Sequence, residues 1–139
     1  MPTDNEAILH RFIHEVINQG RYEVCDEIVA EDFFELDPLP GQRQGREGLK
    51  EVIAMMRSAF PDMYWVNEES IASGDKVVTR FLWTGTHHGN FLGIPATGRP
   101  VTVKGVVIDR LINGRMTDSR ILMDNFVMMT QLGVIPPPA

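Results

Sequence analysis

The chain has 139 residues, of which 43% are hydrophobic and 23% charged, a balance typical of one globular domain that excludes a disordered or fibrous chain. Its net charge is −6 at pH 7, with lysines and arginines scattered among acidic residues. We therefore expect no nucleic-acid partner, because phosphate backbones are bound by clustered cations. No apolar run approaches the roughly 20 residues that span a bilayer, and no N-terminal segment is typical of a signal peptide. Cys25 is the single cysteine, which excludes an internal disulfide. We expect a cytoplasmic protein with no membrane partner.

The N-terminal half is predicted to be mainly helical. Apolar residues recur at helical spacing over residues 8–17. A shorter helix is predicted over residues 22–29 and a third over residues 46–60, which Pro61 ends. Between the second and third helices, a short extended segment begins at Phe33.

The C-terminal half changes to a hydrophobic period of two, which is typical of strands. The dipeptide Asn113-Gly114 predicts a hairpin, because both positions can adopt positive φ in a type I′ turn. Strands are predicted over residues 63–72, 76–88, 101–112 and 115–129. The order predicts a single α+β domain over residues 1–139, with three N-terminal helices packed on a strongly bent antiparallel sheet. Such a sheet, closed at one end by helices, makes a cone whose interior suits an apolar ligand pocket.

Asp124 is the first candidate for chemistry, because it interrupts the apolar run from Ile121 to Met129. Burial would cost free energy and raise the pKa of this carboxyl. A carboxylate of raised pKa in an apolar pocket is a competent general base for carbon acids. The alternative is an aspartate on the exposed face of a strand or bonded to a nearby backbone N–H, and composition alone favours that alternative.

Two basic side chains in the strand predicted over residues 76–88 are candidates for polarising a carbonyl. Arg80 could anchor a carboxylate or polarise a carbonyl, although a solvent-facing position is an equally good interpretation. His87 stands near the end of the same strand. Strand alternation places the two on opposite faces unless a bulge intervenes, so we expect at most one to line the pocket.

The sequence gives little support for a metal or cofactor site. His10 and His14 are four residues apart on the first helix, but no third ligand is near in sequence, so an edge position on a solvated helix is the better interpretation. Cys25 has no histidine at motif spacing and is expected in the core. We predict no metal and no cofactor, and an apolar small molecule as the substrate. The candidate pocket walls are the large apolar side chains Phe12, Phe34, Met56, Trp65, Trp83, Phe91 and Phe126.

Several stretches, taken in order along the chain, resemble the SnoaL-like polyketide cyclase or ester cyclase family of the nuclear transport factor 2-like superfamily. They are Asn18–Gly20, Gly45–Leu49, Phe60–Asp62, Gly85–Arg99, and Asp124 followed by Gln131-Leu132-Gly133. The resemblance implies a cone-shaped α+β barrel and ring closure by intramolecular aldol condensation without a cofactor. It also implies that Asp124 removes a proton flanked by carbonyls, after which the enolate attacks a second carbonyl. This makes a buried, catalytic Asp124 the preferred interpretation.

The resemblance has two departures. The cyclases carry an inward-facing histidine where this chain has Val107, which we include among the pocket residues, and many relatives have a histidine where it has Leu36. Without them the group that stabilises the enolate oxygen is unidentified, and such donors are worth several kcal/mol.

Three other functions compete with a cyclase or isomerase. One is a hydrolase related to the epoxide-opening enzymes of this fold, with Asp124 activating water and Arg80 positioning an acid; Leu82 at the position of their second carboxylate counts against it. The others are a non-catalytic binder of apolar small molecules and a protein-interaction module.

A homodimer is expected. The strand over residues 76–88 has apolar groups on both faces, with Phe81 and Trp83 on one and Val78 and Leu82 on the other. One face can pack on the core, and the apolar groups on the other face need to be covered. The family resemblance implies that a second subunit covers them, in a dimer formed through the outer face of the sheet.

Overall fold

The computed structural model describes residues 4–136. In chain order the elements are α1 (Asp4–Arg11) continued by the π-helical turn η1 (Phe12–Ile17), the 3-10 turn η2 (Tyr22–Val24), α2 (Cys25–Ile28), β1 (Val29–Glu35), α3 (Gly45–Ala59), β2 (Tyr64–Ser73), β3 (Lys76–Thr86), β4 (Pro100–Ile112), β5 (Arg115–Met123) and α4 (Asn125–Leu132).

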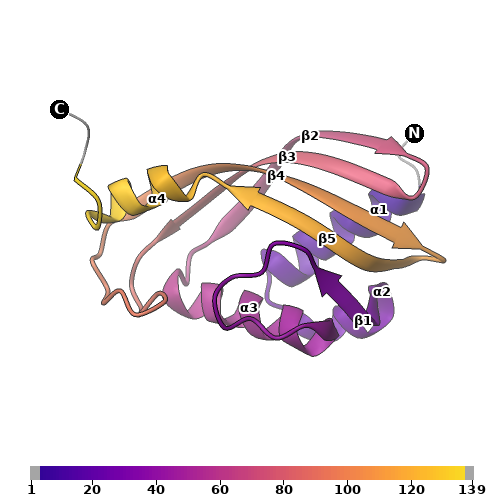
Figure 1. Cartoon of the computed structure of the whole chain (residues 1–139), viewed down its shortest axis with the longest axis horizontal. Coiled ribbons are helices and arrows are strands. Elements are labelled where there is room, and N and C mark those ends of the chain that lie inside the picture. The colour runs from indigo at the N-terminus through magenta and orange to yellow at the C-terminus, as the bar shows by residue number, and fades with distance from the viewer. Residues whose placement is uncertain (1–3, 137–139) are drawn as a thin grey trace.

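The five strands form one curled, unclosed sheet in the order β1-β5-β4-β3-β2. The helices α1 and α3 lie on one side of the sheet, and α4 stands at its far end (Figure 1). This is the predicted α+β architecture. The predicted meander from β2 to β5 is antiparallel, and β1 adds to its edge by pairing with β5 in parallel. A hairpin connection makes two strands antiparallel. No hairpin joins β1 to β5, so these two strands can pair in parallel.

Alternation along β3 separates the interior from the outer face. Phe81 and Trp83 are buried inside, while Arg80 is exposed on the other face. Phe81 stacks on Trp65 of β2 with ring centroids 3.6 Å apart, and it lies opposite Gly105 of β4. Because Gly105 has no side chain, the sheet can bend over this aromatic pair.

The hairpin at Asn113-Gly114 forms as predicted. The φ angles are 53° at Asn113 and 78° at Gly114, the left-handed values that a type I′ turn needs.

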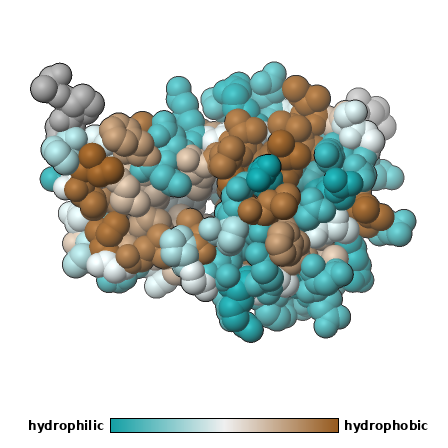
Figure 2. Space-filling view, in the orientation of Figure 1, coloured by the Kyte–Doolittle hydropathy of each residue, from teal (hydrophilic) through white to brown (hydrophobic). Residues whose placement is uncertain are grey.

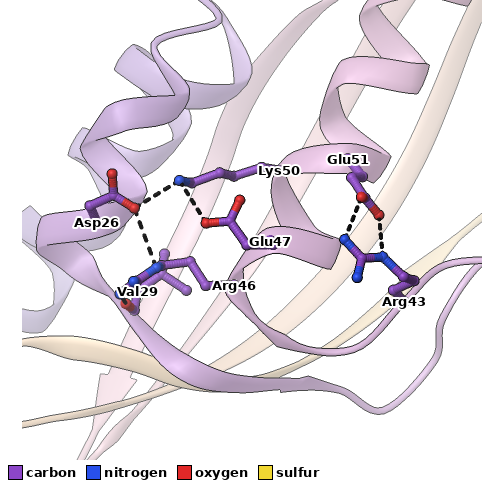
Figure 3. Close-up of polar contacts among 7 residues, drawn as sticks. All are labelled: Asp26, Val29, Arg43, Arg46, Glu47, Lys50 and Glu51. Carbon is purple, nitrogen blue, oxygen red and sulfur yellow. Dashed lines mark hydrogen bonds and ion pairs between the residues drawn. The ribbon is translucent and has the colours of Figure 1, made fainter.

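Polar contacts fasten the outer side of α3 to α2 and β1 (Figure 3). Lys50 Nζ lies 2.7 Å from Asp26 Oδ1, and Arg46 donates a hydrogen bond of 3.3 Å to the carbonyl oxygen of Val29. Lys50 lowers the pKa of Asp26. Exposed ion pairs of this kind add little stability individually. They orient the helix so that Leu49 and Ile53 are buried under the sheet.

The C-terminal segment differs from the prediction. The last strand ends at Met123, and residues 125–132 form α4 instead of continuing it. Asp124 caps this helix, its carboxylate accepting a hydrogen bond of 3.1 Å from Val127 N, and Gly133 ends it with a φ of 81°. These two residues are strong helix boundary signals, and the apolar run from Phe126 to Met129 between them carries no alternation that would hold it in a sheet.

On the face shown in Figure 2, the surface over the sheet is more apolar than the surface over α2 and α3. Figure 2 shows apolar side chains gathered over the strands in the upper part of the view and polar ones over α2, α3 and β1 below. The exposed apolar residues on the outer face of the sheet include Val66, Ile71, Val106, Ile108 and Leu122. Among residues 4–136, no helix has the length and apolar character to cross a membrane.

Candidate active site

A cavity of about 470 Å³ lies between the inner face of the sheet, the helices and the loop after β1. This volume is within the usual range for small-molecule sites. Its walls are mainly apolar. Among the expected pocket residues, the structure places in the lining Phe12, Met56, Trp65, Trp83 and Val107.

A row of three polar residues crosses the cavity wall on neighbouring strands. Ser119 of β5 pairs in register with Glu35 of β1 on one side and with Asp109 of β4 on the other. All three line the cavity. Glu35 and Ser119 are each 5% exposed and Asp109 is 2% exposed. Two carboxyl groups are thus buried at one level of an apolar pocket.

Asp109 has the more strongly perturbed carboxyl. Its pKa is raised from 3.8 to about 7, mainly by burial; a hydrogen bond with the Ser119 side chain acts in the opposite direction, and the nearby Glu35 carboxylate adds to the rise. A carboxyl group with a pKa near 7 can both accept and donate a proton at neutral pH. Asp109 is therefore suited to acid–base chemistry.

Hydrogen bonds hold both the side chain and the main chain of Glu35. Burial also raises its pKa, but its Oε2 accepts a hydrogen bond of 2.9 Å from Asp37 N, which counteracts the rise. The main chain of Glu35 is fixed by Gln44: Glu35 N donates to Gln44 Oε1 at 2.8 Å, and Gln44 Nε2 donates to Glu35 O at 3.0 Å. The position of this side chain is therefore defined by the strand and by the loop that follows it.

The structure corrects the expectation for Asp124. Its side chain is exposed, does not line the cavity and caps α4 instead of lying in an enclosed apolar pocket. The physical reason is the change from strand to helix at this residue: the first turn of a helix has free N–H groups, and an aspartate at the N-cap satisfies one of them.

Neither basic candidate lines the cavity. Arg80 points outward and donates a hydrogen bond of 2.9 Å to Glu68, so the arginine that the hydrolase alternative needs lies outside the pocket. His87 is fully buried, but its ring stacks on Phe60 with centroids 5.3 Å apart, and its Nδ1 lies 3.0 Å from Thr97 Oγ1. It anchors the loop between β3 and β4.

Three expected wall residues lie elsewhere. Phe34 and Phe126 are exposed, at 49% and 59%, because β1 alternation turns Phe34 outward and α4 carries Phe126 on its solvent side. Phe91 is buried, but it packs against Phe60 with ring centroids 5.4 Å apart and does not line the cavity. Leu36 is exposed as well.

The described part of the chain holds no group of three histidine, cysteine, aspartate or glutamate residues arranged for a metal ion. His10 and His14 are exposed on a shallow surface groove. Cys25 is buried, and burial raises the pKa of its thiol to about 11, which makes it a poor nucleophile at neutral pH. Within residues 4–136, no lysine, arginine or histidine lines the cavity.

Glu35 and Asp109 are the functional candidates that the sequence interpretation missed. Both follow from strand alternation: Asp109 stands two residues from Val107 and from Leu111 on the inward face of β4, and Glu35 stands two residues from the buried Phe33. An acidic residue in phase with buried neighbours is the signal that could have identified them.

The family comparison covers nearly the whole chain. The family model described as SnoaL-like polyketide cyclase matches residues 7–132. An aklanonic acid methyl ester cyclase of Streptomyces peucetius is 26% identical over 128 residues, which cover 90% of this chain and 88% of that protein. The nogalonic acid methyl ester cyclase of Streptomyces nogalater is 26% identical over 118 residues, which cover 84% of this chain and 88% of that protein.

Solved structures agree with the sequence matches. TsrD from Streptomyces laurentii superposes with a TM-score of 0.86 at 26% identity, covering 95% of this chain and 96% of that one. A SnoaL-like polyketide cyclase from Agrobacterium tumefaciens superposes with a TM-score of 0.79 over 96% of this chain and 100% of that one; its 18% identity makes it a comparison of fold alone. From the family match and the shared fold together, the chain belongs to the SnoaL-like polyketide cyclase family.

Proposed function

We propose that this protein is a cofactor-independent cyclase that closes a ring in a carbonyl-rich substrate by intramolecular aldol condensation, with Asp109 as an acid–base group of the site. The observation that carries the proposal is a carboxyl of pKa about 7 buried in the wall of an apolar cavity. Removal of a proton beside a carbonyl requires a group of this kind. Relatives that match most of the chain in sequence are an aklanonic acid methyl ester cyclase and a nogalonic acid methyl ester cyclase.

The charge of the cavity favours a neutral substrate. Glu35, Asp37 and Asp109 line it, and no cationic side chain of residues 4–136 accompanies them. A substrate with a free carboxylate would meet like charges in an apolar site, which is strongly unfavourable. An ester or ketone of the same shape avoids this repulsion. We therefore propose a neutral, carbonyl-rich ester as the substrate class.

The proposed reaction needs only proton transfers and positioning. A carboxylate of the pocket removes a proton from a carbon that carbonyl groups flank. The resulting enolate carbon attacks a second carbonyl of the same molecule, and the oxygen of that carbonyl takes up a proton. The apolar walls hold the chain folded on itself, which makes the attack intramolecular, and they exclude water from the enolate.

The test compares two aspartates in one assay. Turnover of aklanonic acid methyl ester and nogalonic acid methyl ester is measured for the wild type, Asp109→Asn and Asp124→Asn. We expect Asp109→Asn to lose about a hundredfold or more of kcat, since it removes an acid–base group, and Asp124→Asn to retain activity, since asparagine also caps helices well. The opposite result would return the catalytic role to Asp124.

Binding of the esters without turnover would favour a different function. If the wild type binds both esters but converts neither, a non-catalytic binder of apolar small molecules becomes the leading account, because the same cavity serves both functions.

A further inference from the structure

We propose that Glu35 and Asp109 work as one acid–base pair, in which Glu35 takes the proton from the substrate carbon and Asp109 donates a proton to the oxygen that becomes negative. This inference rests on the proposed function, and it supplies the proton donor that Arg80 and His87, which do not line the cavity, do not provide.

The geometry of the sheet places the pair. Glu35 and Asp109 stand in β1 and β4, on either side of Ser119 in β5, and the register aligns all three. Neighbouring strands are about 4.8 Å apart, so the main chains of Glu35 and Asp109, two strands apart, are separated by roughly 10 Å, and both side chains enter the cavity from the same wall. A substrate held against this wall can be contacted by both.

The surroundings of the two carboxyls decide which one holds the proton. Glu35 receives a hydrogen bond from Asp37 N and further stabilisation from backbone groups of Leu36 and Ile121, all of which favour its ionised form. Asp109 is buried more completely, and burial raises its pKa by more than the hydrogen bond with the Ser119 side chain lowers it. Close to neutral pH the proton therefore resides mainly on Asp109, and Glu35 is the carboxylate.

Two further carboxylates affect the pKa values of the pair. Asp118 acts on Asp109 and Asp37 acts on Glu35, and both raise the pKa of the carboxyl that they face. Each is itself paired with an arginine outside the cavity: Asp118 lies 3.2 Å from Arg110, and Asp37 lies 2.9 Å from Arg120. Their negative charge is thus partly neutralised. The cavity walls are otherwise mainly apolar, with Val107 and Met116 among them.

The reaction sequence balances without an added reagent. Glu35 accepts the proton when the substrate C–H bond breaks, and the C–C bond forms as the enolate adds to the second carbonyl. The oxygen of that carbonyl becomes an alcohol oxygen by taking the proton of Asp109. The pair then holds one proton as before, now on Glu35, and its transfer back to Asp109 resets the site. Nothing is oxidised or reduced.

The first experiment follows the carboxyl groups themselves and needs no substrate. Carboxyl ¹³C resonances of aspartate and glutamate are recorded from pH 4 to 9 in the wild type, Glu35→Gln, Asp109→Asn and the control Asp124→Asn. We expect Asp109 to titrate near neutral pH in the wild type. We expect its midpoint to fall by roughly one pH unit in Glu35→Gln, because coupled sites respond to each other, and to stay unchanged in the control. An unchanged Asp109 midpoint in Glu35→Gln, or a wild-type Asp109 that titrates like an exposed aspartate, would overturn the pair.

The second experiment measures kcat/KM against pH with aklanonic acid methyl ester as the probe. We expect a bell-shaped profile in the wild type, rising as Glu35 ionises and falling as Asp109 loses its proton. Glu35→Gln should lose the rising limb and about a hundredfold or more of kcat, and Asp109→Asn should lose the falling limb. Full activity of Glu35→Gln with an unchanged profile contradicts the pair.

The two experiments separate the pair from the proposed function. Coupled titration in a protein that turns over neither ester would support the pair and reject the cyclase. Normal turnover with uncoupled titration would support the cyclase and reject the pair.

Discussion

The environment of Asp109 makes the stability of the protein depend on pH. The pKa of this carboxyl is raised from 3.8 to about 7 in the folded protein, so the folded state binds a proton that the unfolded chain has lost. The contribution of Asp109 to the free energy of unfolding is therefore most favourable below pH 4, falls as the pH rises from about 4 to about 7, and is constant above that.

The variant Asp109→Asn should remove this dependence. We expect it to unfold at the same urea concentration as the wild type at pH 4 and to be more stable at pH 8. The shift corresponds to a difference on the order of 4 kcal/mol as an upper limit. Urea denaturation of both proteins at pH 4, 6 and 8 measures it. A stability difference that does not change with pH would show that Asp109 is ionised normally in the folded state.

Asp124 is expected to matter for the fold rather than for the reaction. Its carboxylate accepts the hydrogen bond from Val127 N at the start of α4. Asp124→Ala should lose roughly 1 kcal/mol of stability, while Asp124→Asn should lose little, because asparagine caps helices as well as aspartate does. Thermal unfolding of both variants checks this order. Equal destabilisation by alanine and asparagine would contradict a capping role.

At the scale of single elements, the bend of β4 depends on Gly105. A Cβ atom at this position would collide with Phe81 Cζ and lie 2.8 Å from the carbonyl oxygen of Leu122. Gly105→Ala should therefore displace Phe81 from its stack on Trp65 and lower the stability by about 1–3 kcal/mol. The matched control is Lys104→Ala, which changes an exposed neighbour on the same strand. Urea denaturation and tryptophan fluorescence would report both effects, and an unchanged Gly105→Ala protein would contradict the close packing.

Regular periodicity made most elements predictable. The strands β2, β3 and β4 and the helix α3 lie within two residues of their predicted ends, because their apolar residues repeat with one clear period. The last segment could not be assigned by that criterion, since Phe126 to Met129 is apolar at every position. Asp124 was for this reason interpreted as an isolated acid in a strand, although an aspartate before an apolar run is also an N-cap signal.

The cavity could be predicted from the sequence, but its buried carboxyls were missed. A bent sheet under helices predicts an interior pocket, and the walls at Trp65 and Trp83 follow from it. Glu35 and Asp109 come together only through the parallel pairing of β1 with β5. That pairing joins segments far apart in the chain, and no turn signal or period in the sequence specifies it.

For the whole molecule, we predict a homodimer through the outer face of the sheet, as family membership suggests. Val106 and Leu122 lie in register on neighbouring strands and are both exposed, with Ile108 next to them. Exposed apolar side chains that adjoin in this way mark interaction surfaces. Sedimentation velocity at micromolar concentration should give the mass of two chains, and Val106→Lys should give one chain with its fold intact. A monomeric wild type would contradict the dimer.

The amide of Gln44 has a consequence for how the protein behaves at high concentration. β1 is an outermost strand of the sheet, and such strands offer free N–H and C=O groups to which another chain can add. Gln44 engages both main-chain groups of Glu35 that face away from β5, as an added strand would. One side chain thus blocks the end of this strand against intermolecular β-pairing. Gln44→Ala should lower the protein concentration at which aggregates form, measurable by light scattering, whereas Gln42→Ala in the same loop should not.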